Sequence, residues 1–250
     1  MKKVIMSIIA VILCISLSAC GEAKQNLDSE DSMLSIKMQI NIEEANIALL
    51  ESNETVVASL YAFLETDVET SEILLESALA SVQDAKKRID SSVSCPNSIS
   101  KELSELEENY ETTIVLLSKY SELSKKEKDE VINLMLNGSS IHLHLIEYIT
   151  AFTNLYNIRE FDQLPDDEAN LKNSWWKFGF DNDIQCTETI DKQDLYLIWG
   201  RQFFEGLDEN EFLEEINVLR ENDDLSNPDV NQKWAEFIES FIFKVECHSV

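Results

Sequence analysis

The sequence predicts an all-α fold: a long antiparallel helical hairpin, coiled-coil-like or folded into a compact four-helix bundle, followed by a smaller aromatic-rich helical region. The 250 residues include only 5 Gly and 3 Pro, too few for the many turns of a sheet protein. Apolar residues recur at heptad spacing along two long stretches, which is typical of packed helices. All 4 Trp and most of the Phe residues follow position 160.

The first nineteen residues have the features of an export signal rather than of a folded element. Lys2 and Lys3 precede an apolar run at positions 4–15. This run is shorter than the roughly 20 residues that cross a bilayer as a helix. It leads into Leu17-Ser18-Ala19-Cys20, which resembles the lipobox of bacterial lipoproteins: an aliphatic residue, two small residues and an obligatory Cys.

The resemblance covers residues 1–20 only and makes Cys20 the expected lipidation site. It implies that residues 1–19 are a signal peptide that is removed, that the thiol carries a diacylglycerol, and that the new amino group is acylated, for example with palmitate. Each buried methylene contributes about 0.8 kcal/mol, and two or more chains anchor a protein stably in a membrane. The alternative is an uncleaved N-terminal anchor with an incidental Cys, which the short apolar run disfavours.

Gly21 bears on which membrane holds the protein. In Gram-negative lipoproteins, Asp after the lipidated Cys often retains the protein at the inner membrane. Gly at this position therefore implies the outer membrane, facing the periplasm. In a Gram-positive bacterium, the same anchor places the protein on the outer face of the plasma membrane.

Residues 20–34 are polar and lack periodicity, so we interpret them as a tether to a helical part at residues 35–160. The first half of that part contains two heptad rows with few polar members, which predict a helix packed along one side. The first row is Ile36, Glu43, Leu50, Val57, Leu64, Ser71, Ala78 and Ala85, and the second is Ile40, Ile47, Glu54, Tyr61, Val68, Leu75, Val82 and Ile89.

Pro96 marks the turn of the hairpin, because proline disfavours helical backbone in the preceding residue. A second pair of heptad rows follows at a similar distance from Pro96, which predicts antiparallel pairing of the two halves. In that register we expect Glu54 opposite Gly138 and Glu43 near the hydroxyl of Tyr148; the alternative is that both carboxylates reach solvent. The rows are Leu103, Tyr110, Leu117, Ser124, Val131, Gly138, Leu145 and Phe152, with Leu106, Thr113, Tyr120, Glu127, Leu134, Ile141, Tyr148 and Leu155.

Two stretches decide between long arms and a compact bundle. Thr66-Asp67-Val68-Glu69 and Ser124-Lys125-Lys126-Glu127 both resemble capping boxes. If both begin new helices, each arm folds back and a four-helix bundle results. If neither does, the arms reach up to about 85 Å at 1.5 Å per residue. Since no Gly or Pro occurs at either stretch, we favour mostly continuous arms.

Residues 161–250 form the predicted aromatic-rich helical region, because each aromatic side chain buries a large area. Pro165 suits a helix N-terminus, Gly179 and Gly206 suit helix ends, and Asn227-Pro228 suits the start of the last helix. We expect the buried face of that last helix to consist of Trp234, Phe237, Ile238, Phe241 and Ile242.

The charge of the chain limits its partners. Lys and Arg number 20 and Asp and Glu 48, for a net charge of −28. Removal of residues 1–19 takes away Lys2 and Lys3, leaving 18 cations against 48 acids and a net charge of −30. This charge disfavours binding of nucleic acid or anionic lipid through a basic face. It favours encounter with a cationic protein partner.

Motifs for catalysis, cofactors or metal are missing from the sequence. It lacks a Gly-rich phosphate loop, a Gly-x-Ser-x-Gly elbow and a His-Glu-x-x-His pair. His142 and His144 lie about 200° apart on a helix and cannot share a metal, so we expect both at the surface or rim. Cys186, Cys247 and His248 are too loosely spaced for a zinc site. We therefore predict no catalytic residues, no cofactor and no metal site.

Five further residues are candidates for a role. In an exported protein, two of Cys95, Cys186 and Cys247 can form a disulfide and leave one thiol, or all three stay reduced. Their pairing cannot be derived from spacing. The adjacent Trp175 and Trp176 are candidate docking anchors for a partner, as Trp often is. The alternative is that they close the junction between the hairpin and the C-terminal region.

Together these features predict a lipid-anchored, exocytoplasmic and non-enzymatic protein that binds or scaffolds another protein through an acidic helical surface. One alternative is an inhibitor or immunity protein against a cationic toxin or hydrolase, which charge steering would suit. Another is a carboxylate-dependent enzyme of the cell envelope. Such an enzyme requires a pocket with two inward carboxylates about 5–10 Å apart.

Overall fold

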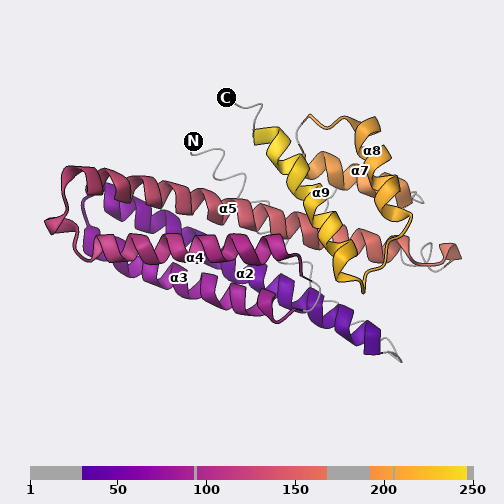
Figure 1. Cartoon of the computed structure of the whole chain (residues 1–250), viewed down its shortest axis with the longest axis horizontal. Coiled ribbons are helices and arrows are strands. Elements are labelled where there is room, and N and C mark those ends of the chain that lie inside the picture. The colour runs from indigo at the N-terminus through magenta and orange to yellow at the C-terminus, as the bar shows by residue number, and fades with distance from the viewer. Residues whose placement is uncertain (1–29, 93–94, 168–191, 205, 247–250) are drawn as a thin grey trace.

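The structure, a computed structural model, describes residues 30–92, 95–167, 192–204 and 206–246. Within these ranges the ordered elements are seven α-helices and one short 3-10 helix, and strands do not occur. The predicted all-α class is therefore confirmed. Its two predicted parts are visible in Figure 1 as a bundle of long helices and a group of shorter C-terminal helices.

The long helices form a four-helix bundle. They are α2 (Glu30–Leu64), α3 (Val68–Asp90), α4 (Asn97–Leu117) and α5 (Lys125–Asp162). Each helix packs against the next one in the chain, and α2 also packs against α5, which closes the ring (Figure 1). Of the two arrangements that the sequence allowed, the compact bundle is present, and the preference for continuous arms was wrong.

Both arms break at the two stretches that resembled capping boxes, because side chains there satisfy the free amides of a new helix. Ser124 accepts from the Glu127 amide at 3.4 Å, and the Glu127 carboxylate accepts from the Ser124 amide at 2.7 Å. In the first arm the cap is Asp67, which accepts from the Thr70 amide at 3.2 Å. Thr66 adopts a left-handed φ of 68° that reverses the chain without glycine.

The predicted seams of α3, α4 and α5 face the core, whereas the seam of α2 was assigned to the wrong side. The buried apolar residues of α2 are Ile42, Ala45, Leu49, Val56 and Phe63. The predicted seam residues Ile40, Ile47, Tyr61 and Leu64 are instead exposed. This helix carries apolar heptad rows on two sides, and a heptad pattern does not say which side meets the other helices.

Two further pairings were expected across the hairpin, at Gly138 and at Tyr148. Glu54 is exposed, and the space at Gly138 is taken by α4, since a Cβ there would lie 2.7 Å from the Tyr110 ring. The Tyr148 hydroxyl lies 2.8 Å from the Ser98 hydroxyl and donates to the Ala235 carbonyl oxygen at 3.2 Å. Tyr148 therefore joins α5 to α4 and to the last helix.

The C-terminal helices are α7 (Lys192–Phe203), α8 (Glu209–Arg220) and α9 (Pro228–Glu246). They cover the C-terminal half of α5, where α7 and α9 pack directly on it (Figure 1). The last helix begins at Pro228 as predicted, and Gly206 follows α7 with a positive φ of 72°. The expected helix end at Gly179 lies outside the described residues.

An aromatic cluster forms the core of this second part. Phe204, Phe212, Phe237 and Phe241 contact one another with ring centroids 4.8 to 6.2 Å apart. Trp199 joins them and donates its indole N–H to the Ala151 carbonyl oxygen of α5 at 3.1 Å. The predicted burial of Trp234, Phe237, Ile238 and Phe241 is confirmed, while the side chain of Ile242 lies outside the described part.

Candidate functional site

The site residues predicted from the sequence fall mostly outside the described ranges. This holds for Cys20, Trp175, Trp176, Cys186 and Cys247. Cys95 is described and carries a free, half-buried thiol whose pKa is raised by burial. The predictions for the other five residues therefore remain untested, and the described chain offers further candidate features.

Among the described residues, α2 carries a row of exposed apolar side chains that the fold does not explain. We define the outer face as Ile40, Ile47, Glu54, Tyr61 and Leu64. Its four apolar side chains are between 46% and 60% exposed. The first four members are spaced seven residues apart and therefore lie along one side of the helix. The segment Ile40–Leu64 is long and apolar enough to cross a membrane by length and composition, although 28% of its most apolar window is buried against the rest of the chain.

The neighbouring edge of α5 extends this apolar surface. Leu136 and Leu143 are 51% and 39% exposed. They continue in heptad spacing to Thr150, whose Oγ1 accepts from the Asn46 side chain of α2 at 3.0 Å. Because residues seven apart share a side of the helix, Leu136 and Leu143 lie on the edge of α5 that meets α2.

Acidic residues predominate on the helices that form this surface. Between Lys37 and Lys86 the sequence has no Lys or Arg and has 10 Asp and Glu. On α5, the stretch between Lys128 and Arg159 also lacks Lys and Arg. Glu54, in the middle of the outer face, is exposed. The exposed side of α2 therefore combines an apolar row with acids, of which Glu44 is paired with Arg88 of α3.

A carboxylate and histidine cluster lies where α4, α5 and α9 meet. Nδ1 of His144 is 3.0 Å from a Glu102 carboxylate oxygen, and both side chains are largely buried. Glu239 of α9 belongs to the same cluster, and its pKa is raised by burial and then by the negative charge of Glu102. Within the described ranges, no group of three His, Cys, Asp or Glu residues is placed to hold a metal ion.

His142 is fully buried, so its expected position at the surface or rim was wrong. Since a carbonyl oxygen can only accept, Nε2 carries the proton and donates to the Leu49 carbonyl oxygen of α2 at 2.9 Å. Nδ1 then accepts from the Tyr110 hydroxyl of α4 at 3.1 Å. Burial lowers the pKa of His142 and keeps the ring neutral. The sequence offered a signal for the burial of His142. This histidine follows Val131, Met135 and Gly138 at alternating spacings of four and three residues, and all three are buried.

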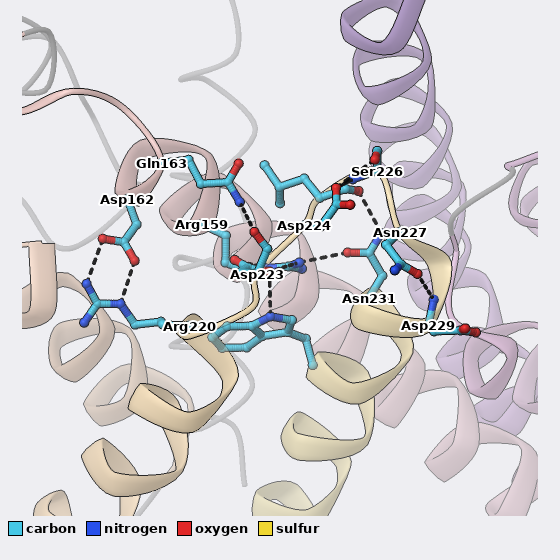
Figure 2. A network of polar contacts seen from close by, with 12 residues as sticks. Arg159, Asp162, Gln163, Arg220, Asp223, Asp224, Ser226, Asn227, Asp229 and Asn231 are labelled. Carbon is cyan, nitrogen blue, oxygen red and sulfur yellow. Dashed lines mark hydrogen bonds and ion pairs between the residues drawn. The ribbon is translucent and has the colours of Figure 1, made fainter.

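A second buried network fastens the C-terminal helices to α5, and Figure 2 shows its side chains converging between the helices. Arg159 is fully buried and donates to both oxygens of the Asp223 carboxylate at 2.6 and 3.0 Å. It also donates to Asn231 at 2.9 Å, and its guanidinium lies 4.9 Å from the centre of the Trp234 ring. Trp234 donates to the same Asp223 carboxylate at 3.0 Å.

Beside this network, Arg220 of α8 forms a two-point ion pair with Asp162 at the end of α5, at 2.6 and 2.8 Å (Figure 2). The Tyr196 hydroxyl of α7 donates to the same carboxylate at 3.0 Å. All three C-terminal helices are thus tied to one end of α5. Sequence reasoning missed both ion pairs, because their partners are 64 and 58 residues apart.

These features divide into two kinds. The His142, Arg159 and Arg220 networks join helices inside the protein, where, among the described residues, Nη1 of Arg159 is the one guanidinium nitrogen buried without a hydrogen-bond partner, whereas the outer face is exposed to solvent. The outer face is therefore the best candidate for a functional site in the described chain. No known protein family, curated protein or solved structure matches this sequence.

Proposed function

We propose that this protein is a lipid-anchored, non-enzymatic binding protein of a bacterial cell envelope that presents an acidic helical surface to another protein. The lipobox-like segment that ends at Cys20 supports the anchor. The observation that carries the binding role is the exposed outer face, with its apolar row and its surrounding acids. Exposed apolar surface of this kind marks interaction sites.

The anchor is tested by fractionation of cells that carry the full-length protein or its Cys20→Ser variant. We expect the wild-type protein in the membrane fraction, labelled by radioactive palmitate and shortened by the signal peptide. The variant should keep the signal peptide and take up no label. A wild-type protein that takes up no label and keeps residues 1–19 would contradict the anchor.

The binding role is tested by affinity capture with the membrane-anchored form, with partners identified by mass spectrometry. We expect a partner of basic sequence that binds in low salt and is released in moderate salt, since screening weakens attraction between exposed charges. Capture of only acidic or neutral proteins, with no dependence on salt, would contradict a role for the acidic surface.

An inhibitor or immunity protein against a cationic toxin or hydrolase is a second candidate of the same binding class. The stretch between Lys37 and Lys86, which has 10 Asp and Glu and no Lys or Arg, favours it, because charge steering speeds the capture of a cationic protein. In this case the captured partner should be an enzyme or toxin whose activity falls when the purified protein is added. If the activity of the captured partner is unchanged, the inhibitor role is excluded and the scaffolding role remains.

A further inference from the structure

We propose that the outer face of α2, together with Leu136 and Leu143 of α5, binds a basic amphipathic helix of another protein. This inference rests on the proposed function, since it names the surface and the class of partner for a protein-binding role. The expected partner helix has apolar residues at spacings of three and four, flanked by Lys and Arg.

The apolar content of α2 exceeds what its own fold requires. Its inner side already supplies Ile42, Leu49, Val56 and Phe63 to the bundle core. A helix that is apolar on two sides is normally covered on both. Single exposed apolar residues are common on protein surfaces, but the outer face repeats them over about 32 Å, at 1.5 Å per residue from Ile40 to Tyr61.

The heptad spacing indicates that the missing cover is a helix. In coiled coils, residues seven apart on one helix meet the same side of a partner helix. Leu136 and Leu143 lie on the edge of α5 that meets α2, so that two neighbouring helices contribute exposed apolar side chains, which we call the apolar strip. A third helix laid along such a strip would contact α2 and α5 at once.

Charge decides between a second copy of this chain and a different partner. Glu54 lies within the strip and Glu51 is exposed on the same helix, whereas Glu44 is already paired with Arg88 of α3. Two copies joined through this face would bring Glu51 and Glu54 of each copy together, and α2 itself has no Lys or Arg after Lys37 to neutralise them. Facing like charges disfavour an interface, whereas Lys or Arg at the flanks of a partner helix would pair with these carboxylates.

Charge also argues against a membrane surface as the cover. Bilayers with anionic lipids attract basic segments and repel acidic ones.

The inner side of α2 is held in the bundle, where Leu49 accepts from buried His142 and Asn46 donates to Thr150. The strip can therefore bind a helix without any rearrangement of the four-helix bundle.

The test uses the full-length lipidated protein in phosphatidylcholine nanodiscs and three fluorescent peptides. One peptide has Leu at heptad positions with flanking Lys, the second has Glu in place of Lys, and the third has the composition of the first in scrambled order. Binding is measured by anisotropy against empty nanodiscs. We expect the basic patterned peptide to bind about tenfold more tightly than the other two.

The decisive variant is Ile47→Ser with Tyr61→Ser, compared with Ile73→Ser on α3, where the native side chain is similarly exposed, at 58%. All of these positions are exposed, so circular dichroism and thermal midpoints should match the wild type. We expect the double variant to bind the basic peptide about tenfold more weakly and the Ile73 variant to bind it normally. Equal binding by the double variant, or equal binding of all three peptides, would overturn the assignment.

The same variants separate this inference from the function on which it rests. If the double variant still captures the cationic partner of the wild-type protein, the binding role stands and the outer face is not its site. If the wild-type protein self-associates through this face, shown by a dimer that the double variant loses, the assignment to a basic helix is wrong. If the wild-type protein captures no partner and binds no peptide, both proposals fail.

Discussion

The bundle and the C-terminal region are each held together by a buried polar network, but the two networks differ in charge. In the bundle, His142 joins α2, α4 and α5 through neutral donors and acceptors. In the C-terminal region, Arg159 joins α5 to the loop before α9 through the buried carboxylate of Asp223. Loss of one partner leaves an unpaired neutral group in the first case and an unpaired charge in the second. An unpaired buried charge costs more free energy than an unpaired neutral group. The C-terminal region, which has fewer and shorter helices, therefore depends more heavily on the Arg159–Asp223 ion pair than the bundle depends on the contacts of His142.

The largest effect is expected from Arg159→Ala, which leaves Asp223 without its cation. The free energy of unfolding should fall by about 3–5 kcal/mol, the usual result of breaking a buried pair on one side. Urea denaturation of the full chain, followed by Trp fluorescence, measures it. The double change Arg159→Met with Asp223→Leu should recover part of the loss, since it removes both charges but leaves the Trp234 N–H and the Asn231 side chain without these partners. A loss of less than about 1 kcal/mol for Arg159→Ala would mean that the C-terminal region does not depend on its buried ion pair more than the bundle depends on its neutral network.

A smaller effect is expected in the bundle from Gly138→Ala. The added Cβ would meet the Tyr110 ring at 2.7 Å, and the ring carries the hydroxyl that donates to His142. Overpacking costs roughly 1–3 kcal/mol, and the better helix propensity of alanine returns up to ~1 kcal/mol, so a net loss of about 1–2 kcal/mol should appear in urea denaturation. Ser140→Ala, at an exposed position on the same helix, is the matched control and should show no loss.

The neutral network should also respond to pH in a defined direction. Burial lowers the pKa of His142 in the folded state, so the unfolded chain binds a proton at a higher pH than the folded chain does. Stability should therefore fall as the pH drops below the unfolded value of about 6.5, with a slope of at most about 1.4 kcal/mol per pH unit from this residue.

Unfolding curves between pH 7.5 and 5.5 test this dependence. His142→Gln should reduce the slope, although its stability at pH 7.5 also falls through lost hydrogen bonds. His144→Gln leaves the contacts of His142 in place and serves as the control for removal of a histidine. An unchanged slope in the His142 variant would show that other groups cause the acid sensitivity.

The smallest effect is expected from Arg201→Ala. Arg201 pairs with Glu209 at 2.8 Å, and both side chains are about half exposed. Ion pairs of this kind contribute little, because water screens the attraction and holding the side chains costs entropy. Its midpoint in urea should not differ measurably from that of the wild type. A loss as large as that of Arg159→Ala would mean that burial does not set the difference between ion pairs in this region.

Local pattern was sufficient to predict the helical class, the antiparallel halves about Pro96 and the aromatic C-terminal core. It also located the two stretches where the arms break, but not whether they would break. That outcome depended on long-range packing: folding back lets α2 and α3 bury their apolar sides against each other and against α4 and α5. Capping of the new helix ends by Asp67 and Ser124 makes the breaks possible without Gly or Pro.

At the candidate site too, the sequence determined one part of the arrangement and the tertiary structure the other. The sequence by itself determined that Ile40, Ile47 and Tyr61 lie on one side of a helix, because heptad spacing is a property of that helix alone. Only the tertiary structure decided that this side faces solvent while Leu49 and Val56 face the core. It likewise placed His142 inside the bundle and Arg159 against Asp223. The physical reason is that a helix with apolar residues on two sides has no local preference between them, and the choice follows from the helices it meets.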